Sequence, residues 1–389
     1  MNDKKRSALT FVVLLGLVSL FADMTYEGAR SVTGPFLAML GASSITVGFV
    51  AGFGELVGYG LRLASGFISD RTRKYWAITI AGYTINLLAV PALALANHWE
   101  LAAALMIAER MGKAMRNPPR DVMLSHATQR IGRGWGFGFH EAMDQIGALL
   151  GPLLVALVQA LRGEYRLAFA FLLIPAVLAI AVLLAARFLY PRPQDLETSS
   201  LLPSSAKGFS RTFWLYLVAI ACIAAGYVDF PLIAFHFQRA QTVSTPFIPL
   251  LYAIAMGTDA LAALVFGRLF DRYGFAVIAA SAAVSLFFAP LVFAGTLAFA
   301  IAGMILWGIG MGAQESIMRA VVAEMIPSSR RGAAYGFFNT GYGIAWFLGS
   351  ALMGWLYGVS LVLLVAFSMA AQAASIPLVM FVMRRRRST

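Results

Sequence analysis

Residues 66–74 read GFISDRTRK and residues 267–274 read GRLFDRYG, so the pattern G-x-x-x-D-R occurs twice, about 200 residues apart. Each copy follows a long apolar stretch. A second pair of similar segments has nearly the same spacing, since residues 133–139 read RGWGFGF and residues 331–337 read RGAAYGF. These repeats indicate that the chain consists of two related halves.

The composition is that of a protein embedded in a lipid bilayer. Of the 389 residues, 60% are hydrophobic and 12% are charged, whereas roughly 25% of residues are charged in soluble domains. The net charge of +12 lies in short basic clusters between apolar stretches, which argues against a nucleic-acid-binding protein. A single cysteine, Cys222, excludes both an internal disulfide framework and a thiolate zinc site.

Apolar stretches of membrane-spanning length follow one another along the chain. A spanning helix needs about 20 mostly apolar residues, and charge clusters, prolines and glycines divide the chain into about twelve such segments. Consecutive prolines, Pro118 and Pro119, are expected to end the fourth span. The predicted spans are 10–30, 44–66, 75–96, 100–120, 135–160, 166–190, 212–236, 247–269, 275–294, 297–322, 332–357 and 359–383.

Basic residues alternate between successive connections. Every second connection carries arginine or lysine, whereas those around Asn97, Gly163, Gln241, Gly295 and Gly358 carry few or none. Loops rich in lysine and arginine stay on the cytoplasmic side. Both termini are therefore expected in the cytoplasm, which requires an even number of spans.

The longest polar stretch lies near the middle of the chain. It reads PRPQDLETSSLLPSSAKGFSR at residues 191–211, and its proline and serine content is typical of a linker. We therefore predict an all-α membrane protein with twelve transmembrane helices in two pseudo-symmetric six-helix bundles. The predicted parts are an N-terminal bundle at 1–190, a cytoplasmic linker at 191–211 and a C-terminal bundle at 212–389.

The twelve spans, the central linker and the repeated G-x-x-x-D-R pattern together resemble the major facilitator superfamily over nearly the whole chain. The resemblance implies that fold and a transport activity without a cofactor. Arg73 stands where the family's loop motif has a glycine, whereas the second copy keeps the glycine as Gly274. The resemblance assigns a cytoplasmic gating role to Gly66, Asp70, Arg71, Gly267, Asp271 and Arg272.

The fifth span resembles the proton-coupled, drug-efflux-like antiporters of that family. Their signature G-x8-G-x3-G-P matches Gly138, Gly147, Gly151 and Pro152. In the fourth span, Arg110 takes the arginine position of the antiporter motif L-x-x-x-R-x-x-Q-G, with Lys113 and Ala114 at the Gln and Gly positions. A purely structural interpretation stays open for the glycines, because small residues let helices pack closely.

Ionisable residues inside a bilayer are energetically expensive and usually face a wet cavity or a partner. Residues three or four apart share a helix face, and by this rule three spans carry charged faces. The first has Asp23, Glu27 and Arg30, the fourth has Arg110, Lys113 and Asn117, and the fifth has His140 and Asp144 with Glu141 beside them.

Two interpretations of these faces stay open, a structural ion-pair network and a proton-coupling site whose carboxylates have a tunable pKa. For the second, we assign proton coupling to Asp23, Glu27, Glu141 and Asp144, with Arg110 as the switching partner. The substrate cavity is assigned to Arg30, Lys113, Arg116, His140, Asp229, Gln314, Glu315, Asn339, Tyr342 and Trp346. Parallel repeats of this kind place such a cavity between the halves near the membrane midplane.

No nucleotide-binding P-loop, H-E-x-x-H or G-x-S-x-G motif is present, so we expect a transporter and not an enzyme. The expected function is proton-coupled export of a small anionic or zwitterionic solute by alternating access. A proton-driven importer and an exporter of a cation or divalent metal are the alternatives. The expected partners are the substrate, protons and lipid, without nucleic acid, cofactor or resident metal. We expect a monomer in a bacterial-type inner (plasma) membrane.

The alternation of basic connections leads to a test of topology. Tags fused before Met1 and after Thr389 should both face the cytoplasm, because an even number of spans returns the chain to its starting side. Protease accessibility of the two tags in intact cells measures this. Exposure of either tag at the outer surface would contradict the twelve-span arrangement.

Overall fold

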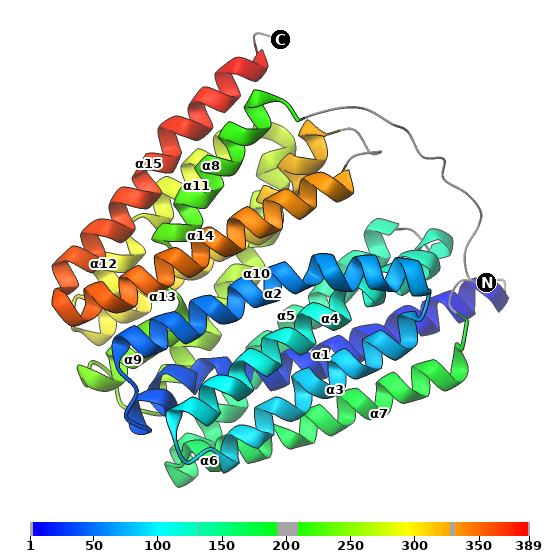
Figure 1. Ribbon diagram of the computed structural model, residues 1–389, viewed down its shortest axis with the longest axis horizontal. Helices are drawn as coiled ribbons and strands as arrows, with labels where there is room; N and C mark the ends of the chain where they lie inside the picture. The colour runs from blue at the N-terminus through cyan, green and yellow to red at the C-terminus, as the bar shows by residue number, and fades with distance from the viewer. Residues whose placement is uncertain (1–2, 132, 193–208, 327–330, 388–389) are drawn as a thin grey trace. The chain divides into compact units, whose positions relative to one another are not determined.

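The computed structural model describes residues 3–131, 133–192, 209–326 and 331–387, and nearly all of them are helical (Figure 1). The first part of the chain forms α1 Asp3–Met39, α2 Ser44–Thr72, α3 Tyr75–Ala92, the short 3-10 helix η1 Leu93–Leu95, α4 Trp99–Ile131, α5 Arg133–Arg162, α6 Tyr165–Phe171 and α7 Leu173–Leu189. The remainder forms α8 Arg211–Gly226, α9 Phe230–Arg239, α10 Phe247–Tyr273, α11 Ala276–Ser285, α12 Phe288–Val292, α13 Leu297–Met325, α14 Arg331–Val359 and α15 Leu361–Arg387.

The helices match the predicted spans. Among the described residues, 10 helical segments are long and apolar enough to cross a membrane. The more polar helix α4 and the shorter apolar stretch Ala276–Val292 account for the two other predicted spans. The predicted all-α membrane fold is confirmed, although the spans at 166–190, 212–236 and 275–294 are each divided into two helices.

Contacts divide the chain into two compact units. The first unit comprises Met1–Val32 and Val57–Leu202, and the second comprises Thr33–Leu56 and Pro203–Thr389. Thr33–Leu56 groups with the second unit because Gly48 and Gly52 pack against the backbone of α14. The halves at 1–190 and 212–389 stay a prediction from the sequence repeat, and residues 193–208 of the linker at 191–211 lie outside the described part.

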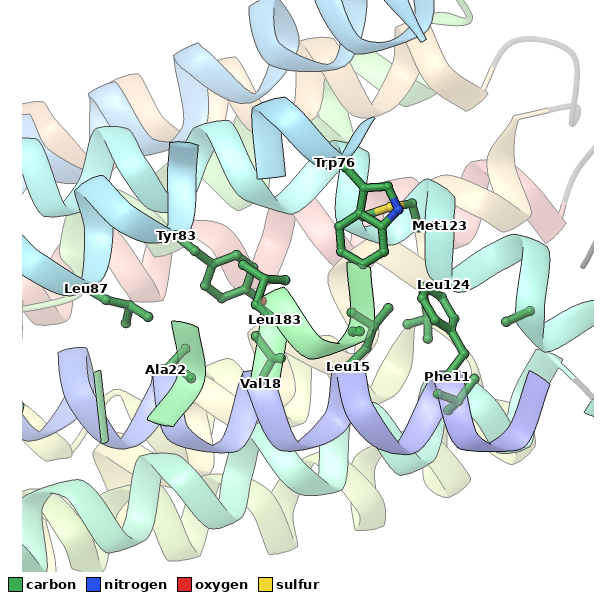
Figure 2. Close-up of a cluster of buried hydrophobic side chains, with 14 of the residues drawn as sticks. Phe11, Leu15, Val18, Ala22, Trp76, Tyr83, Leu87, Met123, Leu124 and Leu183 are labelled. Atoms are coloured by element: carbon green, nitrogen blue, oxygen red, sulfur yellow. The ribbon is translucent and has the colours of Figure 1, made fainter. Parts of the chain in front are cut away.

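The core of the first unit is built by α1, α3, α4 and α7 (Figure 2). Apolar residues of α1 recur at helical spacing and face side chains of the three other helices. The labelled members of this core are Phe11, Leu15, Val18, Ala22, Trp76, Tyr83, Leu87, Met123, Leu124 and Leu183. Packing along this face holds α1 beside α3 and α4, so the turns of α1 after Ala22 remain next to α4.

Helix α4 does not end at its two prolines, so the predicted end of the fourth span was wrong. The helix continues through Pro118 and Pro119 to Ile131. Proline lacks the N–H that would bond the carbonyl four residues earlier, and for Pro119 that carbonyl belongs to Met115. The Ser65 hydroxyl of α2 donates to the Met115 carbonyl at 2.7 Å. A side chain of a neighbouring helix thus replaces the missing backbone bond.

The seventh predicted span is broken between α8 and α9. Pro231, in the first turn of α9, cannot donate a backbone hydrogen bond, and residues 227–229 are not helical. The carbonyl of Gly226 accepts a hydrogen bond from the Ser368 hydroxyl at 2.6 Å, and the carbonyl of Val228 accepts one from the Trp307 indole N–H at 2.9 Å. The break places Asp229 directly before α9.

The helices that carry the two copies of the G-x-x-x-D-R pattern are each followed by a residue with a positive φ. Arg73, after α2, has a φ of 55°, and Gly274, after α10, has a φ of 60°. Their N–H groups donate to the carbonyls of Ser69 and Phe270, at 2.8 and 2.7 Å. A residue with positive φ at the end of a helix is usually glycine. Arg73 therefore adopts a conformation that a side chain disfavours.

This turn predicts a stabilising substitution. Arg73→Gly should raise the thermal stability of the detergent-purified protein by about 1 kcal/mol, because glycine has no Cβ to disfavour the left-handed conformation. Arg73→Ala is the matched control, since it removes the same charged side chain but keeps the Cβ. Equal melting temperatures for the glycine and alanine variants would show that the turn stores no strain.

Candidate functional site

A cluster of buried charges lies between α1 and α4 in the first unit. Asp23 and Glu27 occupy successive turns of α1, and each is 7% exposed. Arg116 Nη2 lies 3.8 Å from Asp23 Oδ1, and Lys113 Nζ lies 3.9 Å from Glu27 Oε1. Arg30 Nη1 is 4.0 Å from the same Glu27 oxygen. Charge-assisted hydrogen bonds are about 2.7–2.9 Å long, so these three separations are those of ion pairs at longer range.

Two tyrosines enclose the cations of this cluster. Lys113 Nζ lies 3.8 Å from the ring centroid of Tyr26, and the Arg116 guanidinium lies 4.1 Å from that of Tyr83. Such contacts stabilise a desolvated cation. Arg116 is fully buried, yet its Nε and Nη1 atoms have no hydrogen-bond partner among the described residues. The guanidinium therefore keeps donor groups that can bind a further oxygen.

Arg110, the expected switching partner, lies beside a different carboxylate. Its Nε atom is 3.4 Å from Glu109 Oε2, and the Asn86 amide donates to Glu109 Oε1 at 2.7 Å. The position opposite Asp23 is held by Arg116, which the sequence interpretation placed in the substrate cavity. Arg116 follows Lys113 by three residues, so the sequence alone could have placed these two cations on the same face of α4.

Residues of α5 form a second polar group with α1 and α4. His140 Nε2 lies 3.8 Å from Asp144 Oδ1 and 3.3 Å from Ser19 Oγ. Arg120 Nη1 donates to Ser19 Oγ at 3.3 Å. Glu141, expected to couple protons, is exposed. Sequence reasoning missed Ser19, because a lone serine in an apolar helix carries no distinctive pattern.

The glycines of the antiporter-like motif bring α5 against α1. A Cβ added at Gly147 or Gly151 would clash with the carbonyl oxygens of Leu20 or Met24, so the two backbones are in direct contact. Pro152 is buried within α5, and the side-chain environment at Gly138 lies outside the description. Close packing of small residues explains the spacing physically, and it sets α5 beside the turn that carries Asp23.

Four of the expected cavity residues come together in the second unit. The Trp346 indole N–H donates to Asp229 Oδ2 at 3.2 Å, and the Tyr342 hydroxyl donates to Gln314 Oε1 at 2.8 Å. The rings of Tyr342 and Trp346 are 5.5 Å apart. Two further expected residues are less enclosed, since the structure shows Glu315 as exposed and Asn339 as half-buried.

The expected gating residues lie at the ends of α2 and α10. Arg71 and Arg272 are exposed in the last turns of these helices, whereas Gly66 and Gly267 lie one turn earlier. The Arg272 guanidinium is 5.2 Å from the Tyr273 ring centroid. The side chains of Asp70 and Asp271 are outside the described part of the chain. Their gating role stays a prediction.

Sequence comparison identifies relatives across the whole chain. The family model of the Major Facilitator Superfamily matches residues 15–350 and, in a second match, residues 215–389. An uncharacterized protein of Mycobacterium tuberculosis (strain ATCC 25618 / H37Rv) is 42% identical over 387 residues, covering 98% of this chain and 94% of that protein. An uncharacterized MFS-type transporter of Methanocaldococcus jannaschii is 26% identical over 372 residues, covering 92% and 91% of the two chains.

A shorter match and a similar fold complete the comparison. The multidrug resistance protein MdtH of Proteus mirabilis is 29% identical over 153 residues, which cover 39% of this chain and 36% of that one. The crystal structure of the nucleoside transporter NupG has a similar fold, with a TM-score of 0.75 at 13% identity over 95% of this chain and 99% of that one.

The buried pair of Asp23 and Arg116 predicts a large stability effect. Arg116→Gln should destabilise the purified protein by about 3 kcal/mol, because it leaves the Asp23 carboxylate buried beside fewer positive charges. Arg162→Gln, at an exposed position at the end of α5, is the control and should have little effect. Adding Asp23→Asn to Arg116→Gln should recover part of the loss. Additive losses in thermal unfolding would show that the two side chains do not interact.

Proposed function

Because the chain belongs to the Major Facilitator Superfamily, we propose that it is a proton-coupled exporter of a small anionic or zwitterionic solute that works by alternating access. Family membership itself makes the chain a multi-pass membrane transporter and not an enzyme. The direction of transport, the coupling ion, the substrate class, a monomeric state and a plasma-membrane location with cytoplasmic termini belong to the proposal.

The observation that carries proton coupling is the buried charge cluster of the first unit. Asp23 and Glu27 are withdrawn from water and face Arg116 and Lys113 at 3.8 and 3.9 Å. Burial favours the protonated form of a carboxylate, whereas a nearby cation favours the ionised form. A movement that changes either the hydration of the cluster or its internal distances can therefore load or release a proton.

The same cluster supports the proposed substrate class. Lys113, Arg116 and Arg30 place three cations around the two carboxylates of Asp23 and Glu27, and protonation of either carboxylate increases the excess of positive charge. The Nε and Nη1 donors of Arg116 are without a hydrogen-bond partner in the described part of the chain, and a planar guanidinium binds carboxylates and phosphates in two-point fashion. A cation or divalent metal would instead be repelled by these side chains.

Support for export comes from two independent sources. The partial relative MdtH is named a multidrug resistance protein, and the Gly138, Gly147, Gly151 and Pro152 spacing resembles that of antiporters. A proton-driven importer would use the same cluster with substrate and proton moving in the same direction. The sign of the proton gradient that drives accumulation separates the two.

The proposed function is tested on the full chain in proteoliposomes. A thermal-shift screen with dicarboxylates, amino acids, phosphorylated sugars, nucleosides and organic cations first identifies compounds that stabilise the folded protein. Uptake of each stabilising compound is then measured with the proton gradient imposed in each direction. Antiport predicts accumulation on the side that has more protons. Accumulation on the opposite side would indicate import, and stabilisation only by cations would overturn the substrate class.

Separate neutralisation of three carboxylates tests the coupling site. Asp23→Asn, Glu27→Gln and Asp144→Asn should include at least one variant that loses gradient-driven accumulation yet retains exchange of substrate, since exchange needs no net proton movement. Glu164→Gln, at an exposed position before α6, is the matched control and should behave like the parent. Parental accumulation in all three variants would make these carboxylates structural.

A further inference from the structure

A hydrogen bond joins α2 to the proline-containing segment of α4. The hydroxyl of Ser65, which is 5% exposed, donates to the carbonyl of Met115 at 2.7 Å. Arg116 is the next residue, so this carbonyl belongs to the peptide group that leads into the partner of Asp23. We propose that Ser65 is a positioning residue of the coupling site, whose hydrogen bond sets the distance between Arg116 and Asp23. The inference rests on the proposed proton-coupled function and adds a residue from outside the charge cluster.

The prolines of α4 explain why this bond is needed. In a regular helix the Met115 carbonyl would accept from the N–H of residue 119, which is a proline and has none. Pro118 removes the donor for the carbonyl of Ala114 in the same way. A carbonyl withdrawn from water without a donor costs free energy, so the Ser65 hydroxyl replaces the missing backbone donor from a neighbouring helix. The orientation of the Met115 peptide group therefore depends on the position of α2.

The next residue of α2 touches the same segment of α4. A Cβ added at Gly66 would lie 3.7 Å from the Cβ of Pro118, which is an ordinary van der Waals contact, so the backbone of α2 lies against the first proline. Gly66 is also the first residue of the G-x-x-x-D-R pattern in the last part of α2. A displacement of this end of α2 therefore acts on α4 directly beside Arg116.

Packing fixes α4 on both sides of this peptide group. A Cβ added at Gly112 would clash with the backbone of Gly82 and of Asn86, so α3 and α4 are in direct contact one turn before Arg116. Beyond the prolines, α4 contributes three buried residues to the core of the first unit, Met123, Leu124 and Ala127. Loss of the Ser65 bond is therefore expected to change α4 locally, beside Arg116, and to leave both ends of the helix in place.

A small change in the position of Arg116 affects the protonation of Asp23. The Nη2 atom of Arg116 lies 3.8 Å from Asp23 Oδ1, and the attraction varies with the inverse of the distance. At an effective dielectric constant of about 20, a change of about 0.7 Å moves the pH midpoint of the carboxyl group by about half a unit. The other ionisable groups that act on Asp23 are Lys113 of α4, Tyr26 and Glu27 of α1 and Asp144 of α5. Substitution of Ser65 removes none of them.

The experiment titrates Asp23 in the full chain in lipid nanodiscs, with the proton itself as the probe. Infrared difference spectroscopy across a pH series detects the protonated carboxyl, whose band is identified by its loss in Asp23→Asn. Ser65→Ala should move the pH midpoint of this band by about half a unit, and the sign shows whether Arg116 moves toward Asp23 or away from it. Ser65→Thr keeps a hydroxyl and should retain the parental midpoint.

A second serine of α2 is the matched control for loss of a buried hydroxyl. Ser69 lies one turn further along the helix and is fully buried, and its hydroxyl donates to the carbonyl of Gly66 in its own helix at 2.8 Å. Ser69→Ala should therefore keep the parental midpoint. If Ser65→Ala keeps it as well, the positioning role is overturned while the proposed function stands. If Asp23 takes up no proton over the pH range in which the protein is folded, both proposals fail.

The two prolines allow a rescue experiment that isolates the hydrogen bond itself. Pro119→Ala restores the N–H that a regular helix offers to the Met115 carbonyl, so the Ser65 hydroxyl becomes dispensable. In this background Ser65→Ala should change the pH midpoint and the melting temperature much less than it does in the parent. Pro118→Ala is the matched control, because it restores the donor for the Ala114 carbonyl and should leave the full effect of Ser65→Ala. Equal effects of Ser65→Ala in the two proline backgrounds would contradict the proposed role of the bond.

Discussion

The placement of one fully buried guanidinium, that of Arg116, constrains the whole first unit. A charge withdrawn from water requires compensation by opposite charge, polar groups or aromatic faces. Asp23 supplies the opposite charge from α1, and Tyr83 supplies the ring from α3. The close backbone contact of Gly147 and Gly151 then holds α5 against the same turns of α1. One set of helix positions therefore both packs the core and places the charged side chains of the site.

The membrane makes much of this architecture predictable from sequence. Bilayer thickness sets the length of each apolar segment, and the cost of charge sets where the segments end, so the predicted spans coincide with helices. The continuation of α4 through Pro118 and Pro119 was not predictable in this way. It depends on the Ser65 hydroxyl of another helix reaching the Met115 carbonyl, and spacing within α4 contains no information about that partner.

The same distinction applies to the candidate site, where features within one helix were predictable and contacts between helices were not. Helical spacing correctly indicates that Asp23 and Glu27 share a face, because it depends on one helix alone. The choice between Arg110 and Arg116 as the partner of Asp23 depends on how α4 is rotated relative to α1, and that rotation is set by tertiary packing. Ser19 becomes recognisable only when Arg120 and His140 are seen on either side of its hydroxyl.

The proline pair also makes α4 easier to bend at one point than along the rest of its length. Without backbone donors at Pro118 and Pro119, the segment between Arg116 and Arg120 is held by fewer internal bonds than the turns before and after it. Bending therefore costs least at the point that separates the partner of Asp23 from the partner of Ser19. A small flexion there changes the distance between the Asp23–Arg116 pair and the Ser19–Arg120 contact while leaving each contact intact.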